Sequence, residues 1–231
     1  MSRAPYRVSH VVFDVDGTLV DWDHSYAAAL LAAAEELSGR LGRPISPAAL
    51  AQARELVAAE PAWSRRMLRA IREESIRRVL VAADAYSDET HAAVVGRYFL
   101  ARDEALQPFA DVEPVLEELS ARGFALIAAT NGNAALHRLD WFHHLDHVHV
   151  AEREGVSKPE SAFFTGLLER TGAAAERAIS VGDSIENDVE PPRRLGMHAL
   201  LLDRRGNARD AGLPRIESLT ELPPMLELAS D

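Results

Sequence analysis

Val11-Val12-Phe13-Asp14-Val15-Asp16-Gly17-Thr18 joins an apolar run to two carboxylates, a glycine and a hydroxyl group. The run before Asp14 is short and rich in β-branched residues, which is typical of a buried strand. Side chains alternate along a strand, so Asp14 and Asp16 are expected to point to the same side where the strand ends. Gly17 permits a sharp turn or the close approach of a ligand. Alternatively, the stretch is a strand followed by an ordinary Asp-Gly turn with no chemical role.

The composition is that of a globular protein, and it excludes several classes of function. The 231 residues are 47% hydrophobic and 26% charged, and their number allows one large domain or a core with an insert. A formal net charge of −11 argues against a nucleic-acid polymer or an anionic membrane as a partner. Because the chain has no cysteine, it can form no disulfide, thiolate metal site or cysteine nucleophile.

Two stretches of the sequence predict a cytoplasmic protein without a membrane partner. Met1–His10 lacks the apolar centre of a signal peptide. The longest apolar stretch, Tyr26–Ala34, ends at Glu35 and Glu36 and is too short to span a bilayer.

The order of the predicted elements indicates a sheet core that is interrupted by helices. Strand-like runs occur at Val8–Val15, Phe124–Ala129, Val148–Ala151, Ala178–Val181 and His198–Leu202. The long gap after the first run is dominated by alanine, leucine, glutamate and arginine with helical periodicity. The later strands alternate with helices, as in a doubly wound parallel sheet. The predicted fold class is α/β: a Rossmann-like core of residues 1–20 and 108–231, with an inserted all-helical cap domain over residues 21–107.

Helical segments are predicted on both sides of the boundary at Pro108. Within the insert they cover Asp23–Leu41, Pro47–Glu60, Trp63–Ala82 and Ser87–Gln107. After the insert they cover Asp111–Arg122, Asn133–His144, Pro159–Arg170, Arg193–Leu195 and Glu221–Ala229.

Polar groups follow four of the predicted strands. They are Asp14–Thr18 after the first strand, Thr130–Gly132 after the second, Lys158 in the loop after the third, and Gly182–Asp188 after the fourth. Because the carboxyl ends of parallel strands meet at one edge of a sheet, we expect these groups to share a pocket.

The chemistry that suits such a set is phosphoryl transfer. Asp14 could attack phosphorus, and Asp16 could protonate the leaving oxygen and then deprotonate water. The hydroxyl of Thr130 and nearby amides could hold phosphate oxygens. Several carboxylates suit a hard cation such as Mg²⁺, which together with Lys158 could neutralise charge on the transferred group.

Lys158 is the only lysine among 25 basic residues, the rest being arginine. Lysine carries a compact point charge on a flexible stem, whereas arginine presents a planar fork. A lysine in such a chain therefore indicates a position where arginine does not serve. Chance survival on a surface loop is the alternative.

These four groups resemble, in the same order, the four motifs of the haloacid dehalogenase superfamily. The resemblance covers the whole chain and includes a helical cap between the first and second motifs, as in the subfamily with a C1-type cap (subfamily I). It implies that Asp14 is the nucleophile that forms an aspartyl-phosphate. It also implies that Asp16 is the general acid and base, with a backbone carbonyl that contacts Mg²⁺.

The resemblance implies roles for the other motif residues as well. The substrate phosphate would be bound by Gly17, Thr130, the Asn131 amide and Lys158, which would also orient Asp14. The Mg²⁺ would be held by Asp14, Asp16, Asp183 and Asp188. Related proteins often carry small residues where this chain has Glu190-Pro191-Pro192. This departure leaves open whether Asp188 contacts the metal directly or from the outer shell.

Asp16 separates the reaction types within the superfamily. The dehalogenases resemble one another in carrying a tyrosine at this position, whereas phosphatases and phosphomutases carry a carboxylate. We therefore expect a Mg²⁺-dependent phosphomonoesterase that acts on a small phosphorylated metabolite or nucleotide, as a monomer or homodimer. A phosphomutase stays open as an alternative, while a haloacid dehalogenase and a receiver-like phospho-aspartate switch are weaker ones.

Three further groups of residues carry weaker signals. A histidine cluster, for which a metal site is less favoured than partly exposed positions, comprises His137, His143, His144, His147 and His149. One face of a predicted cap helix, expected to be solvated rather than bound to substrate, carries Arg65, Arg69 and Arg72. The entry to the cap, where the family resemblance places substrate selectors, holds Trp22 and Asp23.

Overall fold

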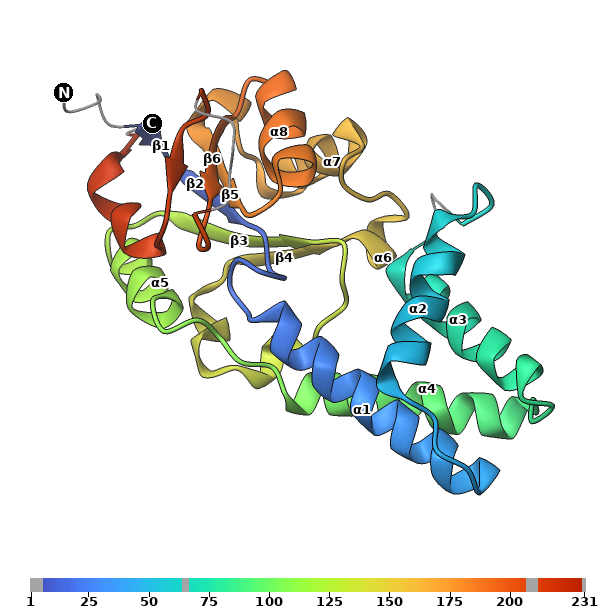
Figure 1. Cartoon of the computed structure of the whole chain (residues 1–231). Coiled ribbons are helices and arrows are strands. Elements are labelled where there is room, and N and C mark those ends of the chain that lie inside the picture. The colour runs from blue at the N-terminus through green and yellow to red at the C-terminus, as the bar shows by residue number, and fades with distance from the viewer. Residues whose placement is uncertain (1–5, 64–66, 207–211, 230–231) are drawn as a thin grey trace. The chain divides into compact units, whose positions relative to one another are not determined.

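The computed structural model describes residues 6–63, 67–206 and 212–229, and the chain divides into two compact units (Figure 1). One unit comprises Met1–Asp21 and Pro108–Asp231, and the other comprises Trp22–Gln107. The first unit holds the parallel sheet, and the second is helical.

A six-stranded parallel sheet forms the centre of the first unit, in the order β4-β3-β2-β5-β6-β7. Its strands are β2 (His10–Phe13), β3 (Ala125–Thr130), β4 (His147–Val150), β5 (Ala178–Gly182), β6 (His198–Leu202) and β7 (Arg215–Ile216). Strand β2 lies between β3 and β5, and Val11, Val12 and Phe13 are at most 1% exposed. The predicted α/β doubly wound fold is confirmed.

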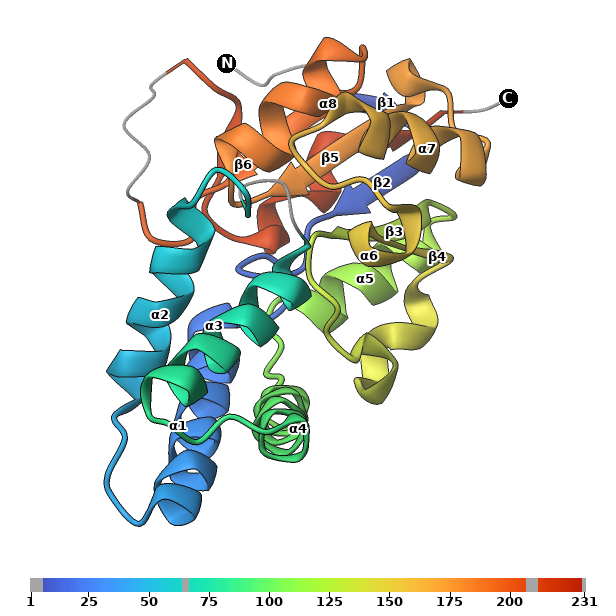
Figure 2. The ribbon, with the colours of Figure 1, turned by 90° about the vertical axis from the view of Figure 1, so that its right-hand side faces the viewer.

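Helices cover both faces of this sheet (Figures 1 and 2). Helix α5 (Val112–Ala121) connects β2 to β3, while α7 (Ser161–Thr171) and α8 (Glu190–Arg194) follow β4 and β5. The connection from β2 to β3 and the connection from β4 to β5 run in opposite directions across the sheet. Right-handed crossovers therefore place α5 on one face and α7 on the other. The short helix α6 (Ala151–Glu154) directly follows β4.

The first predicted strand, Val8–Val15, overlaps two separate strands in the structure. Strand β1 (Tyr6–Val8) pairs in parallel with β8 (Leu226–Leu228) in a separate two-stranded sheet. Ser9 separates β1 from β2; its N–H donates to the Arg177 carbonyl at 2.8 Å, and its carbonyl accepts from Ala125 at 2.9 Å.

Two predicted helices are wrong. Asn133–His144 contains two 3₁₀ turns, Leu136–Arg138 and Asp140–His144, separated by the extended residue Leu139. These turns bury Leu136 and Trp141, so tertiary packing overrides the helical pattern.

The predicted C-terminal helix over Glu221–Ala229 is replaced by a 3₁₀ turn, Pro223–Met225, and strand β8. Two consecutive prolines lack N–H donors and restrict the backbone before them, which disfavours a longer helix here. The guanidinium of Arg122 donates to the carbonyls of Pro223 at 2.8 Å and Leu226 at 2.7 Å, and so fixes this segment.

The second unit consists of helices α1 (Trp22–Leu41), α2 (Pro47–Ala59), α3 (Leu68–Ala82) and α4 (Asp88–Glu104). Its core combines Ala29, Ala33 and Leu37 of α1 with side chains from α3 and α4, among them Leu80, Val94 and Tyr98. Ser46 and Ser87 cap α2 and α4 by accepting hydrogen bonds from backbone N–H groups of the first turn. Among the described residues, no helix has the length and apolar character that a membrane crossing needs.

Candidate functional site

The polar groups that follow the strands meet at the carboxyl edge of the sheet. Asp14 follows β2, Thr130 ends β3, and Asp183 follows β5. The Asp14 N–H donates to the Val181 carbonyl at 2.9 Å, which extends the pairing of β2 with β5 to the site. Lys158 reaches the same edge from the loop between α6 and α7.

Lys158 joins two of the carboxylates. Its Nζ atom donates to Asp14 Oδ1 at 2.6 Å, to Asp188 Oδ1 at 2.7 Å and to the Ala129 carbonyl at 3.0 Å. These three bonds use all the protons of an ammonium group. Lys158 is only 5% exposed, and a planar guanidinium would not place three donors at one point. The geometry therefore gives a physical reason for a lysine in a chain that otherwise uses arginine.

The charge of Lys158 is fixed by these neighbours. Burial alone lowers the pKa of the ammonium group, but the charges of Asp14 and Asp188 outweigh it, and the pKa is raised. Lys158 therefore stays protonated and acts as a fixed positive charge beside Asp14 rather than as a proton donor or acceptor.

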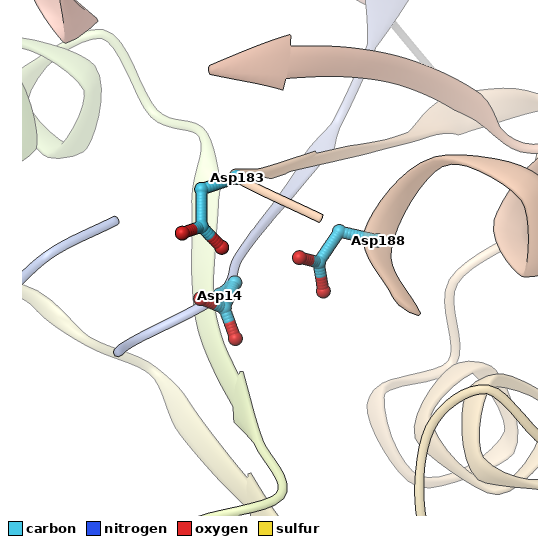
Figure 3. A group of neighbouring side chains, drawn as sticks. All are labelled: Asp14, Asp183 and Asp188. Carbon is cyan, nitrogen blue, oxygen red and sulfur yellow. The ribbon is translucent and has the colours of Figure 1, made fainter. Parts of the chain in front are cut away.

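Three carboxylates converge at this edge of the sheet (Figure 3). Asp14, Asp183 and Asp188 each offer an oxygen, and these oxygens all lie within 4.8 Å of one another. Asp14 is 8% exposed and Asp188 2%, whereas Asp183 is exposed as a whole residue. This cluster carries more negative charge than one lysine neutralises.

The crowding shows in the pKa values of two of these aspartates. Partial burial of its carboxyl group, followed by the charges of Asp14 and Asp188, raises the pKa of Asp183 to about 7. Burial and the charge of Asp14 also raise the pKa of Asp188, although Lys158 opposes them. Without a cation, part of this cluster would hold protons near neutral pH.

Asp188 reaches the site from a π-helical turn, Ile185–Val189. The turn is closed by the Glu190 N–H, which donates to the Ile185 carbonyl, and the Ser184 N–H donates to Asp188 Oδ2 at 3.1 Å. Pro191 and Pro192 follow in the first turn of α8, where missing N–H groups are tolerated. The prolines therefore do not displace Asp188, whose carboxylate contacts Lys158.

Asp16 lies in a tight turn after Asp14. The Val15 carbonyl accepts from the N–H groups of Thr18, Leu19 and Val20, and Gly17 donates to the Val20 carbonyl at 2.9 Å. Gly17 has a φ of 90°, and a Cβ atom there would collide with the Asp183 carboxylate.

The carboxylate of Asp16 is located by a second glycine. A Cβ atom at Gly132 would lie 2.6 Å from Asp16 Oδ2 and 3.2 Å from Thr130 Oγ1. The Asp16 carboxylate thus packs against Gly132, next to the Thr130 hydroxyl. Thr130 Oγ1 accepts from the Gly132 N–H at 2.7 Å, which leaves its own proton for another acceptor.

Asn131 has a role that was not expected from its motif. Its Nδ2 donates to the Lys158 carbonyl at 2.9 Å, and its Oδ1 accepts from the Lys158 N–H at 2.8 Å. The side chain therefore anchors the backbone of the Lys158 loop. No periodicity or spacing in the sequence relates residues 131 and 158.

The histidine cluster gives no metal site in the described part of the chain, where the group of three aspartates is the only set of three potential ligands found. The expectation of partial exposure is wrong for His149, which is fully buried. Its Nε2 lies 3.1 Å from the Phe163 carbonyl, and its Nδ1 lies 3.9 Å from Glu154 Oε1. This ring packs between β4 and α7 and contacts Phe163 edge-on.

The arginines expected on one solvated face of the second unit differ in their exposure. Arg65 lies outside the described residues. Arg69 is exposed and pairs with Glu73 at 2.8 Å, as expected for a solvated face. Arg72 contradicts that expectation because it is 3% exposed, with its guanidinium 4.8 Å from the centre of the Trp22 ring.

Comparisons with known proteins agree with this fold. A family model for haloacid dehalogenase-like hydrolases matches residues 8–196. Glyceraldehyde 3-phosphate phosphatase from Methanopyrus kandleri is 36% identical over 124 residues, covering 52% of this chain and 53% of the relative. Ribulose-1,5-bisphosphate 5-phosphatase from Halopiger xanaduensis is 32% identical over 46% of each chain. The chain thus spans about half the length of these curated relatives.

A solved structure matches over more of the chain. The crystal structure of a 2-haloacid dehalogenase from Pseudomonas syringae pv. Tomato superposes with a TM-score of 0.80 and 29% identity, covering 94% of this chain and 97% of the other. The family model covers most of the sheet unit and all of the helical unit. On these grounds the chain belongs to the haloacid dehalogenase-like hydrolase family.

Proposed function

We propose that this protein is a Mg²⁺-dependent phosphomonoesterase that acts through an aspartyl-phosphate on Asp14. The observation that carries the proposal is the contact of Asp14 with Lys158 at 2.6 Å, beside two further carboxylates and next to the Asp16 turn. This arrangement combines a fixed nucleophile, a permanent positive charge and a second carboxylate for proton transfer. The phosphatase names of the sequence relatives support it.

The proposed reaction has two steps. An oxygen of Asp14 attacks phosphorus, the bond from phosphorus to the ester oxygen breaks, and Asp16 gives its proton to that leaving oxygen. Asp16 then takes a proton from water, which attacks the phosphorus of the aspartyl-phosphate; the bond from phosphorus to the Asp14 oxygen breaks, which releases inorganic phosphate and regenerates the Asp14 carboxylate. Lys158 holds the Asp14 carboxylate in one orientation throughout, while Thr130 and the backbone amides beside it receive phosphate oxygens.

The carboxylate cluster fits a divalent cation. All of its donors are oxygens, which Mg²⁺ prefers, and the raised pKa values of Asp183 and Asp188 indicate negative charge that the protein alone leaves unbalanced. We propose that Asp14, Asp183 and the Asp16 carbonyl hold the ion, with Asp188 beside them. When bound, Mg²⁺ would neutralise negative charge on the transferred phosphoryl group.

This metal site predicts a pH-dependent stabilisation by Mg²⁺. With a pKa of about 7, Asp183 keeps a proton in the metal-free folded state where the unfolded chain, with a pKa of 3.8, has lost it. The folded state then binds more protons between about pH 4 and pH 7, so the stability of the metal-free protein falls as pH rises through this window. Mg²⁺ competes with those protons, so it should stabilise the protein more at about pH 8 than at about pH 5.

Thermal unfolding with EDTA or with excess Mg²⁺ measures this effect. At about 100 times its Kd, Mg²⁺ adds about 2.7 kcal/mol, or roughly 5–10 °C in Tm for a chain of this size. In the matched variant Asp183→Asn, the rise in Tm caused by Mg²⁺ should lose most of its dependence on pH. An equal rise in Tm at both pH values in the wild type would contradict the assignment.

The substrate class that we propose is a small phosphorylated metabolite or nucleotide. The net charge of −11 supports a small anion bound locally rather than a nucleic-acid polymer. We also propose that the helical unit, Trp22–Gln107, serves as a cap that selects the substrate, with Trp22 and Asp23 at its entry.

The name of the solved structure raises a second candidate, a 2-haloacid dehalogenase. The residue at position 16 favours the phosphatase, because an ester oxygen needs a proton when it leaves and a halide ion does not. Incubation with an aryl phosphate, an alkyl phosphate and a 2-chloro acid, with and without Mg²⁺, separates the two reactions. We expect Mg²⁺-dependent release of phosphate and no release of chloride.

The same incubation, extended to a sugar phosphate, tests for a phosphomutase and for a phospho-aspartate switch. Isomer formation from the sugar phosphate without free phosphate would indicate a phosphomutase. A stable phosphoryl group on Asp14 without turnover would indicate a receiver-like switch. Either result, or chloride release without phosphate release, would overturn the proposal.

A further inference from the structure

Arg204 forms a clamp beneath the turn that carries Asp16. It lies just after β6, and its Nη2 atom donates to the Thr18 carbonyl at 2.8 Å. The two Nη atoms also form a bidentate pair with the Asp111 carboxylate, both bonds being 2.9 Å long. The guanidinium stacks 4.0 Å from the centre of the Phe109 ring. The side chains of Arg204 and Asp111 are only 16% and 12% exposed, so the pair is well shielded from solvent.

Asp111 anchors the clamp from the other side. Its Oδ2 also accepts hydrogen bonds from the Ser218 hydroxyl at 2.8 Å and from the Leu219 N–H at 2.9 Å. Burial alone would raise the pKa of Asp111, but the bonds from Arg204 and Ser218 outweigh it and lower the pKa. The carboxylate therefore stays ionised, and the position of Arg204 is set by a rigid partner.

Arg204 also ties together the two segments that cross between the units. The Phe109 N–H donates to the Leu19 carbonyl at 3.2 Å, and Val20 forms an antiparallel bridge with Pro108. The first segment contains the hydrogen-bonded turn of Asp16, Gly17 and Thr18. The clamp therefore fixes this turn against the returning chain and the loop after β6.

We propose that Arg204 is a positioning residue for Asp16. Resting on the function proposed above, the inference is that the clamp on the Thr18 carbonyl, two residues after Asp16, holds that carboxylate where it can protonate the leaving oxygen. Proton transfer requires heavy atoms within about 2.6–3.2 Å of each other, and small misplacements cost about a hundredfold in rate. Arg204 does not touch the substrate in this scheme and acts only through the backbone.

The test compares two leaving groups on the same enzyme preparation. The acidic leaving group of an aryl phosphate departs with little help from Asp16, whereas the leaving group of an alkyl phosphate needs the proton. In Arg204→Met, we expect kcat/KM, which reports the steps up to departure of the leaving group, to fall by about 10- to 100-fold for the alkyl ester and by about threefold or less for the aryl ester. Arg204→Lys retains a charge but not the bidentate fork. Its loss of activity on the alkyl ester should therefore be smaller than that of Arg204→Met but still measurable against the wild type.

The ratio of the two rates does not depend on how much of the variant is folded, so a loss of stability cannot produce the expected result. Arg122→Met is a matched control, because Arg122 also donates to two carbonyls and lies over a ring, that of Phe124 at 5.2 Å. It should leave the ratio unchanged. Equal losses for both esters in Arg204→Met would overturn the positioning role of Arg204 and would leave the proposed function standing. A wild type that hydrolyses neither ester would overturn the proposed function instead.

Discussion

The Asp14→Asn enzyme is expected to release almost no phosphate from any ester, with a rate at least about 10⁴-fold below that of the wild type. An amide nitrogen or oxygen is a poor nucleophile, so the aspartyl-phosphate cannot form. The variant should still fold, because asparagine has nearly the same shape and its oxygen can accept the bond from Lys158. Phosphate release, together with mass spectrometry of the peptide that contains residue 14 after acid quenching, measures both turnover and the intermediate.

The same change elsewhere in the sheet unit provides the control. Asp146 accepts a hydrogen bond from the Leu126 N–H at 2.8 Å near the amino ends of β3 and β4, at the opposite edge of the sheet from the site. Asp146→Asn should therefore keep nearly full activity. If Asp14→Asn stayed within about a hundredfold of the wild type, the nucleophile would have to be another group, since removal of the nucleophile of a serine protease costs about 10⁶-fold.

The arrangement of the sheet was predictable from the sequence because apolar runs locate strands and parallel topology fixes their shared edge. This rule alone predicts that Asp14, Lys158 and Asp183 lie close together, although up to 169 positions separate them. One of the two mispredicted helices lies where local pattern and tertiary packing disagree. The stretch Asn133–His144 has a helical pattern, but burial of Trp141 favours two 3₁₀ turns.

Contacts between loops were beyond the reach of the sequence. The bonds from Asn131 to the Lys158 backbone and from Arg204 to the Thr18 carbonyl join residues that no periodicity relates. In both contacts one partner is a backbone group, so only the residue that supplies the side chain could be identified by its type in the sequence. Sequence motifs therefore located the groups suited to the chemistry, whereas the residues that hold them in place became visible only in the structure.

Removal of the buried ammonium group has the second large expected effect. In Lys158→Met, Asp14 and Asp188 lose their shared cation while both remain nearly buried. Breaking a buried ion pair in this way costs about 3–5 kcal/mol of stability. The activity should also fall by about 10²- to 10³-fold, as when one preorganised charge or donor is removed from an active site.

The loss of stability should depend on pH with a definite sign. Lys158 opposes the rise in the pKa of Asp188, so without it this carboxylate binds protons still more tightly in the folded than in the unfolded state, and the variant loses stability as pH rises. The difference in Tm between Lys158→Met and the wild type, measured in EDTA, should therefore be larger at about pH 8 than at about pH 5. Excess Mg²⁺ should reduce the difference because it supplies positive charge to the same carboxylates.

Lys158→Arg separates charge from geometry. It keeps the positive charge, but a guanidinium is larger, and overpacking a buried site costs about 1–3 kcal/mol. It also cannot direct three donors from one atom toward Asp14, Asp188 and the Ala129 carbonyl. We therefore expect a stability closer to the wild type than that of Lys158→Met, with activity still strongly reduced. An arginine variant as active as the wild type would show that position 158 supplies charge alone, and the single lysine of this chain would then need another explanation.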